Sequence, residues 1–245
     1  NQTSVLLRWA GLPSRLAGNG RLDVDLQVAG NYADLANLQT NGHVNLTETT
    51  FSYHGAPVLT DLRFLCDVND ALCSAEIDSR LLEGTLNGTF KLEHEGLTMG
   101  RCQLDLQGDQ ADLSQLASDM PDWDSFTKGV ASGRYRGTFH RLKVADVNGT
   151  GALHVKGMDV HLVPIISQIL EVVNVTDADL LSASDAMIQF DNQGPALTIR
   201  DGSVASSVTA IKIERGGRVD LKERYVDLHA VWVPLKQVES LLSKL

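Results

Sequence analysis

The sequence has few of the residues that mark a metal site, a cross-linked scaffold or a membrane span. It contains three cysteines and no CxxC pair, so neither a zinc site of that kind nor a disulfide-dense scaffold is expected. No apolar run reaches the roughly 18 residues of a transmembrane helix. The net charge of -10 excludes a typical nucleic-acid binder, because such proteins neutralise phosphates with basic side chains. Hydrophobic residues still make up 43% of the chain, enough for a sizeable core.

Motifs of the common enzyme and cofactor-binding families are also missing. The chain has no GxSxG elbow, no Walker loop, no GxGxxG turn entering a helix and no HExxH helix. The acidic run at 119–124 lacks the spacing of a calcium loop. The histidines lie mostly on the polar sides of predicted strands. We therefore expect no enzyme, no cofactor and no metal site.

Strict alternation of apolar and polar residues is the dominant pattern. This period of two predicts antiparallel strands that each have one apolar and one polar face. The alternating residues expected to line one continuous apolar face are Leu22, Val24, Leu26, Val28, Val44, Leu46, Leu104, Leu106, Leu153, Val155, Leu197, Ile199, Ile211, Ile213, Val219 and Leu221. Pairs such as Asn19-Gly20, Asn41-Gly42 and Asn87-Gly88 predict turns between the strands. The predicted fold class is all-β, an elongated and mostly antiparallel twisted sheet.

Helices are expected to be few and short. Residues 112–118 predict a turn or two of helix. Two apolar strands run into Pro164 and Pro234, and each predicts a further short helix because proline is favoured at the first helical position. The stretch 118–128 is expected to be a bend or short connection between two halves, 1–117 and 129–245.

Cys66 and Cys73 flank a predicted hairpin turn. A two-residue turn at Asn69-Asp70 would place the two cysteines directly opposite each other on neighbouring strands. The pair then either forms a disulfide in an oxidising compartment or packs as two small buried hydrophobes. Cys102 lies on an alternating strand and is expected in the core.

The second half of the chain, residues 129–235, resembles the C-terminal region of the AsmA-like family of Gram-negative envelope proteins. The segments that carry the resemblance are 149–160, 186–190, 197–202, 216–221 and 225–228. They are patterns of glycine and alternation in a fixed order, and they contain no invariant catalytic residue. The first half resembles the weaker AsmA/TamB-type repeats. One departure is that the chain stops where the family usually adds another strand.

The resemblance implies that the sheet folds into an open, β-taco-like trough with its apolar side chains inside. Family members are anchored in the inner membrane, here by a part of the protein outside this sequence, and extend through the periplasm. They are associated with phospholipid movement towards the outer membrane. The expected function is therefore a non-enzymatic envelope segment that provides an apolar groove for phospholipid acyl chains between the two membranes.

Alternation alone does not separate a trough from a sandwich, in which the same apolar stripes pack against a second sheet. The low aromatic content of 5% and the prevalence of aliphatic residues favour a smooth lining. Two other functions stay open: a structural or adhesive β-solenoid or sandwich that binds no lipid, and a carbohydrate-binding sandwich. A carbohydrate-binding sandwich requires an exposed aromatic platform. Trp9, Trp123 and Trp232 are too scattered in the sequence to form one.

Overall fold

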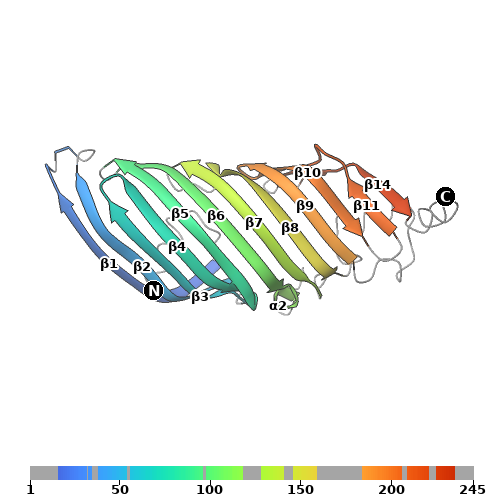
Figure 1. The fold of residues 1–245 in the computed structure, drawn as a ribbon, viewed down its shortest axis with the longest axis horizontal. Coiled ribbons are helices and arrows are strands. Elements are labelled where there is room, and N and C mark those ends of the chain that lie inside the picture. The colour runs from blue at the N-terminus through green and yellow to red at the C-terminus, as the bar shows by residue number, and fades with distance from the viewer. Residues whose placement is uncertain are drawn as a thin grey trace, which may run out of the picture. The chain divides into compact units, whose positions relative to one another are not determined.

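The computed structural model describes residues 16–31, 33–34, 38–53, 56–95, 98–117, 128–140, 146–158, 184–205, 209–220 and 225–234. Most of these residues lie in β-strands (Figure 1). The helix predicted at 112–118 is present as α2 (Ser114–Ala117). Asp112 precedes this helix, and its carboxylate accepts a hydrogen bond of 2.9 Å from the Ser114 N–H at the helix start. The two helices predicted after Pro164 and Pro234 fall outside the described residues.

All the strands belong to one open sheet. They are β1 (Leu16–Ala29), β2 (Gln39–Tyr53), β3 (Ala56–Asn69), β4 (Leu72–Leu81), β5 (Gly84–Glu95), β6 (Thr98–Asp112), β7 (Val130–His140), β8 (Asn148–Met158), β9 (Ser184–Gln193), β10 (Ala196–Ala205), β11 (Thr209–Ile213), β12 (Arg218–Asp220), β13 (Tyr225–Asp227) and β14 (Ala230–Pro234). Their hydrogen-bonded order is β1-β2-β3-β4-β5-β6-β7-β8-β9-β10-β11-β14, and β12 pairs with β10 and β13. Every pair with a described register is antiparallel. The prediction of an all-β, open antiparallel sheet is confirmed.

The chain forms two compact units. Unit 1 comprises Asn1–Asp109 and Arg134–Gly149, and unit 2 comprises Gln110–Gly133 and Thr150–Leu245. This division cuts across β6, β7 and β8 and does not follow the predicted halves 1–117 and 129–245. The predicted bend at 118–128 lies outside the described residues apart from Lys128, so that boundary stays a prediction.

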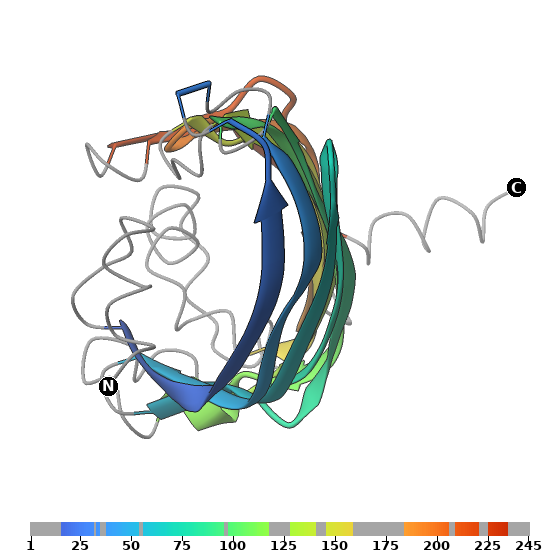
Figure 2. The same cartoon turned by 90° about the vertical axis from the view of Figure 1, so that its left-hand side faces the viewer.

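The strands of unit 1 curve along their length. Figure 2 shows β1 to β5 bending as a group, which gives the sheet of this unit one concave face. The register of β2 with β3 shifts near Glu48, at φ 50°, and that of β3 with β4 shifts near Asp61, at φ 54°. Such bulges bend a strand and increase its twist. A curved, one-layer sheet in this unit fits the predicted trough.

The turns predicted at Asn-Gly pairs are wrong at Asn19, Asn41 and Asn87, because all three pairs lie inside strands. Here glycine permits close approach of a neighbouring strand. A Cβ atom at Gly20 would overlap the side chain of Thr49 on β2, which pairs with β1. Glycine inside a strand often marks such an approach. These pairs therefore indicate tight contact between strands, and they do not end the strands.

The tight turn between β4 and β5 uses no glycine at its centre. Leu82 and Glu83 both adopt positive φ, 48° and 66°, and join Leu81 to its partner Gly84. Two consecutive residues at positive φ make the type I′ geometry that matches the twist of a hairpin. The carbonyl oxygen of Val58 accepts a hydrogen bond of 3.1 Å from the Leu82 N–H, which ties this turn to β3.

Candidate functional site

The apolar side chains of unit 1 form three parallel rows across its strands. Residues directly opposite each other in an antiparallel pair share one face of the sheet, so the register defines each row. The central row is Val24, Val44, Cys66, Ala75, Phe90 and Leu104. The flanking rows are Leu22, Leu46, Phe64, Ile77, Gly88 and Leu106, and Leu26, Gly42, Val68, Cys73, Leu92 and Cys102. We call these three rows the apolar stripe.

The apolar stripe runs perpendicular to the strands from β1 to β6. Its outer rows are four residues apart along each strand, about 13–14 Å at the rise of an antiparallel strand. All eight of the predicted lining residues between Leu22 and Leu106 lie on this face; Val28 extends it by one position on β1, opposite Thr40. The structure therefore brings these predicted residues together on one surface.

Exposure changes along the apolar stripe. On β1, Val24 is 51% exposed, Leu26 is 41% exposed and Val28 is 38% exposed. On β3 and β6, by contrast, Cys66 and Cys102 are 2% and 0% exposed. The stripe is therefore open over β1, half-buried over β2, and buried at several positions from β3 to β6.

Aromatic side chains account for the buried part. Phe64 and Phe90 have ring centroids 5.9 Å apart, and Phe90 and Phe139 have centroids 6.5 Å apart. All three pack against a buried cluster of Cys66, Cys73, Ala75, Leu92 and Cys102. The predicted lining does not include these residues, although the same alternation at 64–68, 73–77 and 86–92 is a signal for them.

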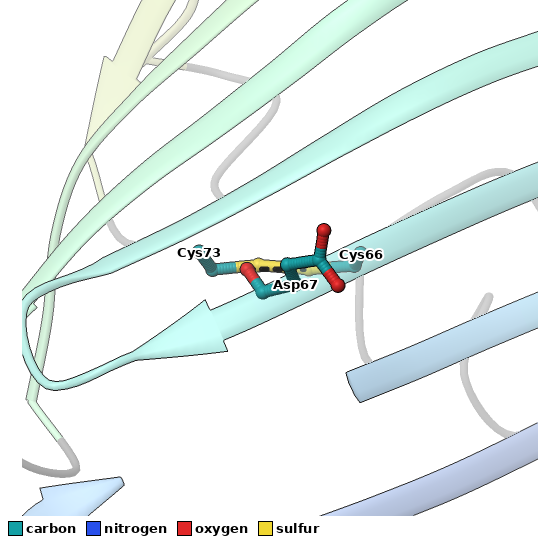
Figure 3. Close-up of a disulfide and its surroundings, with 3 residues drawn as sticks. All are labelled: Cys66, Asp67 and Cys73. Atoms are coloured by element: carbon teal, nitrogen blue, oxygen red, sulfur yellow. Dashed lines mark hydrogen bonds between the residues drawn. A yellow bond between two sulfur atoms is a disulfide. The ribbon is translucent and has the colours of Figure 1, made fainter. Parts of the chain in front are cut away.

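Cys66 and Cys73 form a disulfide inside this cluster, with Cα atoms 6.4 Å apart (Figure 3). The distance lies in the usual range for disulfides. The predicted register is wrong, because Asn69 pairs with Leu72 and Cys66 therefore lies opposite Ala75. The turn sits one residue further along, at Asp70-Ala71. Moving the turn by one residue shifts the pairing by two, which keeps both cysteines on the same face.

In unit 2, several predicted lining residues form a buried core. Exposed fractions are 7% for Val155, 1% for Ile199, 3% for Ile211 and 8% for Ile213. The register places Ile199 opposite Phe190. The same register logic places Leu197 opposite Val219, and both are half-buried. Leu153 is 42% exposed, and Leu221 lies outside the described residues.

Among the described residues of unit 1, three hydroxyl side chains are buried, and they differ in their hydrogen bonding. The Thr49 hydroxyl donates to the Thr47 carbonyl oxygen at 3.0 Å, and the Ser79 hydroxyl donates to the Thr60 carbonyl oxygen at 2.9 Å. The Thr40 side chain is 5% exposed, and its Oγ1 has no hydrogen-bond partner. An unpaired buried hydroxyl is costly, so Thr40 calls for a functional explanation.

The opposite face of unit 1 is polar and holds a shallow hollow of about 580 Å³. Its lining includes His43, Asp67, Glu76 and Lys91, a mixture of both charge signs. At the Arg136–Asp105 pair the guanidinium Nε donates to the carboxylate at 2.8 Å, but exposed pairs of this kind contribute little stability. Within the ranges that the structure describes, no three His, Cys, Asp or Glu side chains are grouped to hold a metal ion.

Comparisons with known proteins found no matching family model, no matching curated protein and no matching solved structure. The resemblance to the AsmA-like family therefore rests on the glycine and alternation patterns alone. In the described part of the chain, no helix combines the length and the apolar character needed to cross a membrane.

Proposed function

We propose that this chain is a non-enzymatic segment of an AsmA-like envelope protein, and that its apolar stripe holds phospholipid acyl chains in transit between the inner and outer membranes. The observation that carries the proposal is the exposed start of the stripe at Val24, Leu26 and Val28. Three neighbouring aliphatic side chains on one strand, each more than a third exposed, form a surface that gains free energy when an apolar ligand covers it.

The chemistry of the stripe suits a sliding hydrocarbon chain. Transfer of apolar groups from water is worth about 0.8 kcal/mol per CH₂ buried, and the interaction has no directional requirement. The rows cross β1 to β6 without a charged side chain. An acyl chain can therefore lie on the open part of the stripe, over β1 and β2, without breaking a hydrogen bond.

The disulfide supports a periplasmic location for this segment. Disulfides persist in oxidising compartments, including the bacterial periplasm, and are rare in the cytosol. The Cys66–Cys73 bond lies in the dry cluster of the stripe. The proposal includes an inner-membrane anchor outside this sequence, as in the AsmA-like family.

Lipid analysis of the natively purified protein tests the proposal. Protein expressed in the periplasm of a Gram-negative host and purified without detergent should carry phospholipid at a reproducible stoichiometry, measured by mass spectrometry of an organic extract. An unrelated periplasmic β-protein purified in parallel provides the background. Extracts that match this background in repeated preparations would contradict lipid binding and favour the structural or adhesive alternative.

A further inference from the structure

Thr40 is a buried hydrogen-bond donor placed at the margin of the apolar stripe. It lies directly opposite Val28 and two residues before Gly42, which belongs to an outer row of the stripe. It therefore shares the apolar face. With 5% of its surface exposed and no partner for Oγ1, it differs from Thr49 and Ser79, whose hydroxyls donate to backbone carbonyl oxygens.

We infer that the Thr40 hydroxyl donates a hydrogen bond to an ester carbonyl oxygen of the bound lipid, so that the site selects ester-linked over ether-linked glycerolipids. This inference rests on the proposed function. The ester is the first polar group at the end of an acyl chain, and Thr40 is the first polar side chain past the outer row of the stripe on β2.

The contact requires a neighbouring side chain to move, because Thr40 is only 5% exposed. Its cross-strand neighbour Val28 is 38% exposed, so the valine can change position without disrupting a packed core. A lipid bound in this way has its tail on Leu26 and Val24 and its ester group at Thr40, opposite Val28.

A comparison of two lipids tests the inference. Wild-type protein, Thr40→Val and Thr40→Ser are each incubated with vesicles containing equal amounts of diacyl and dialkyl phosphatidylglycerol of the same chain length. The protein is then separated from the vesicles, and both retained lipids are quantified by mass spectrometry. A net hydrogen bond of about 0.5–1.5 kcal/mol predicts that wild-type protein retains roughly twofold to tenfold more of the ester lipid.

The variants separate recognition from folding. Thr40→Ser should keep the preference for the ester lipid, and Thr40→Val should retain both lipids equally. Thr40→Val should also melt at the same or a higher temperature, because it removes an unsatisfied buried group. Thr49→Val is the matched control: it loses the hydrogen bond to Thr47, so its melting temperature should fall while the ester preference stays.

Two results would overturn the inference in distinguishable ways. Equal retention of both lipids by wild-type protein would show that Thr40 does not recognise the ester group, because the two lipids carry the same headgroup and differ only in the ester linkage. The proposed function would stand in that case. Retention of neither lipid by wild-type protein would overturn the proposed function and the Thr40 inference together.

Discussion

Replacement of Leu26 by aspartate should abolish lipid retention and lower the melting temperature only slightly. Leu26 is 41% exposed and lies opposite Gly42, which has no side chain. A carboxylate at this position stays hydrated, so the loss of stability should be about 1 kcal/mol or less, below the several kcal/mol of a charge buried in a core. The charge nevertheless interrupts the exposed part of the apolar stripe, and the lipid should be lost.

Gln27→Asp is the matched control for this variant. It places the same new charge on the same strand, but on the opposite face of the sheet, where Gln27 pairs with Asn41. Lipid extraction and a thermal melt should show normal lipid content and near-normal stability. Unfolding of Leu26→Asp would indicate that Leu26 is a core residue, as in a sandwich. A folded Leu26→Asp protein with normal lipid content would exclude Leu26 from the lipid path.

Loss of the disulfide should destabilise the protein by about 2–3 kcal/mol, the chain-entropy value for so short a loop. The variant is the double substitution Cys66→Ala and Cys73→Ala, and the measurement is denaturant unfolding with and without reductant. The wild-type protein should lose stability on reduction, whereas the double variant should not respond. Cys102 is buried and is not part of a disulfide.

Thiol labelling of the unfolded wild-type chain checks the bond itself. One labelled thiol before reduction and three after it are expected. Three labelled thiols before reduction would show that Cys66 and Cys73 are not bridged in the isolated protein. The disulfide would then no longer support an oxidising compartment.

The faces of the strands could be predicted from the sequence, because alternation depends only on local backbone geometry. The alternating residues Leu22, Val24, Leu26, Val28, Leu104 and Leu106 lie on the apolar face. Cys66 and Cys73 lie on the same face, as predicted, although the predicted turn was one residue off. The resulting shift of two residues in the strand register does not change which face a side chain occupies.

The turns and the covered part of the stripe could not be predicted in the same way. The Leu82-Glu83 turn adopts positive φ without glycine, whereas Gly20 lies within a strand against Thr49. Both depend on contacts between strands that sequence spacing does not reveal. The exposed fraction of a side chain also could not be predicted. Val24 and Cys66 occupy one row of the stripe, yet Val24 is 51% exposed and Cys66 is 2% exposed. Alternation identifies the apolar face but does not identify what packs on it.

Site-specific photo-cross-linking tests the central claim most directly, because it asks which face of β1 touches lipid in the cell envelope. A photoreactive amino acid at position 24, in place of the exposed Val24, should form a covalent adduct with phospholipid on irradiation. The same residue in place of Asp25, its neighbour on the polar face, should form none. Phospholipid adducts at position 24 and not at position 25 are the predicted result. Equal adducts at both positions, or none at position 24 in a folded protein, would contradict a lipid-binding apolar stripe.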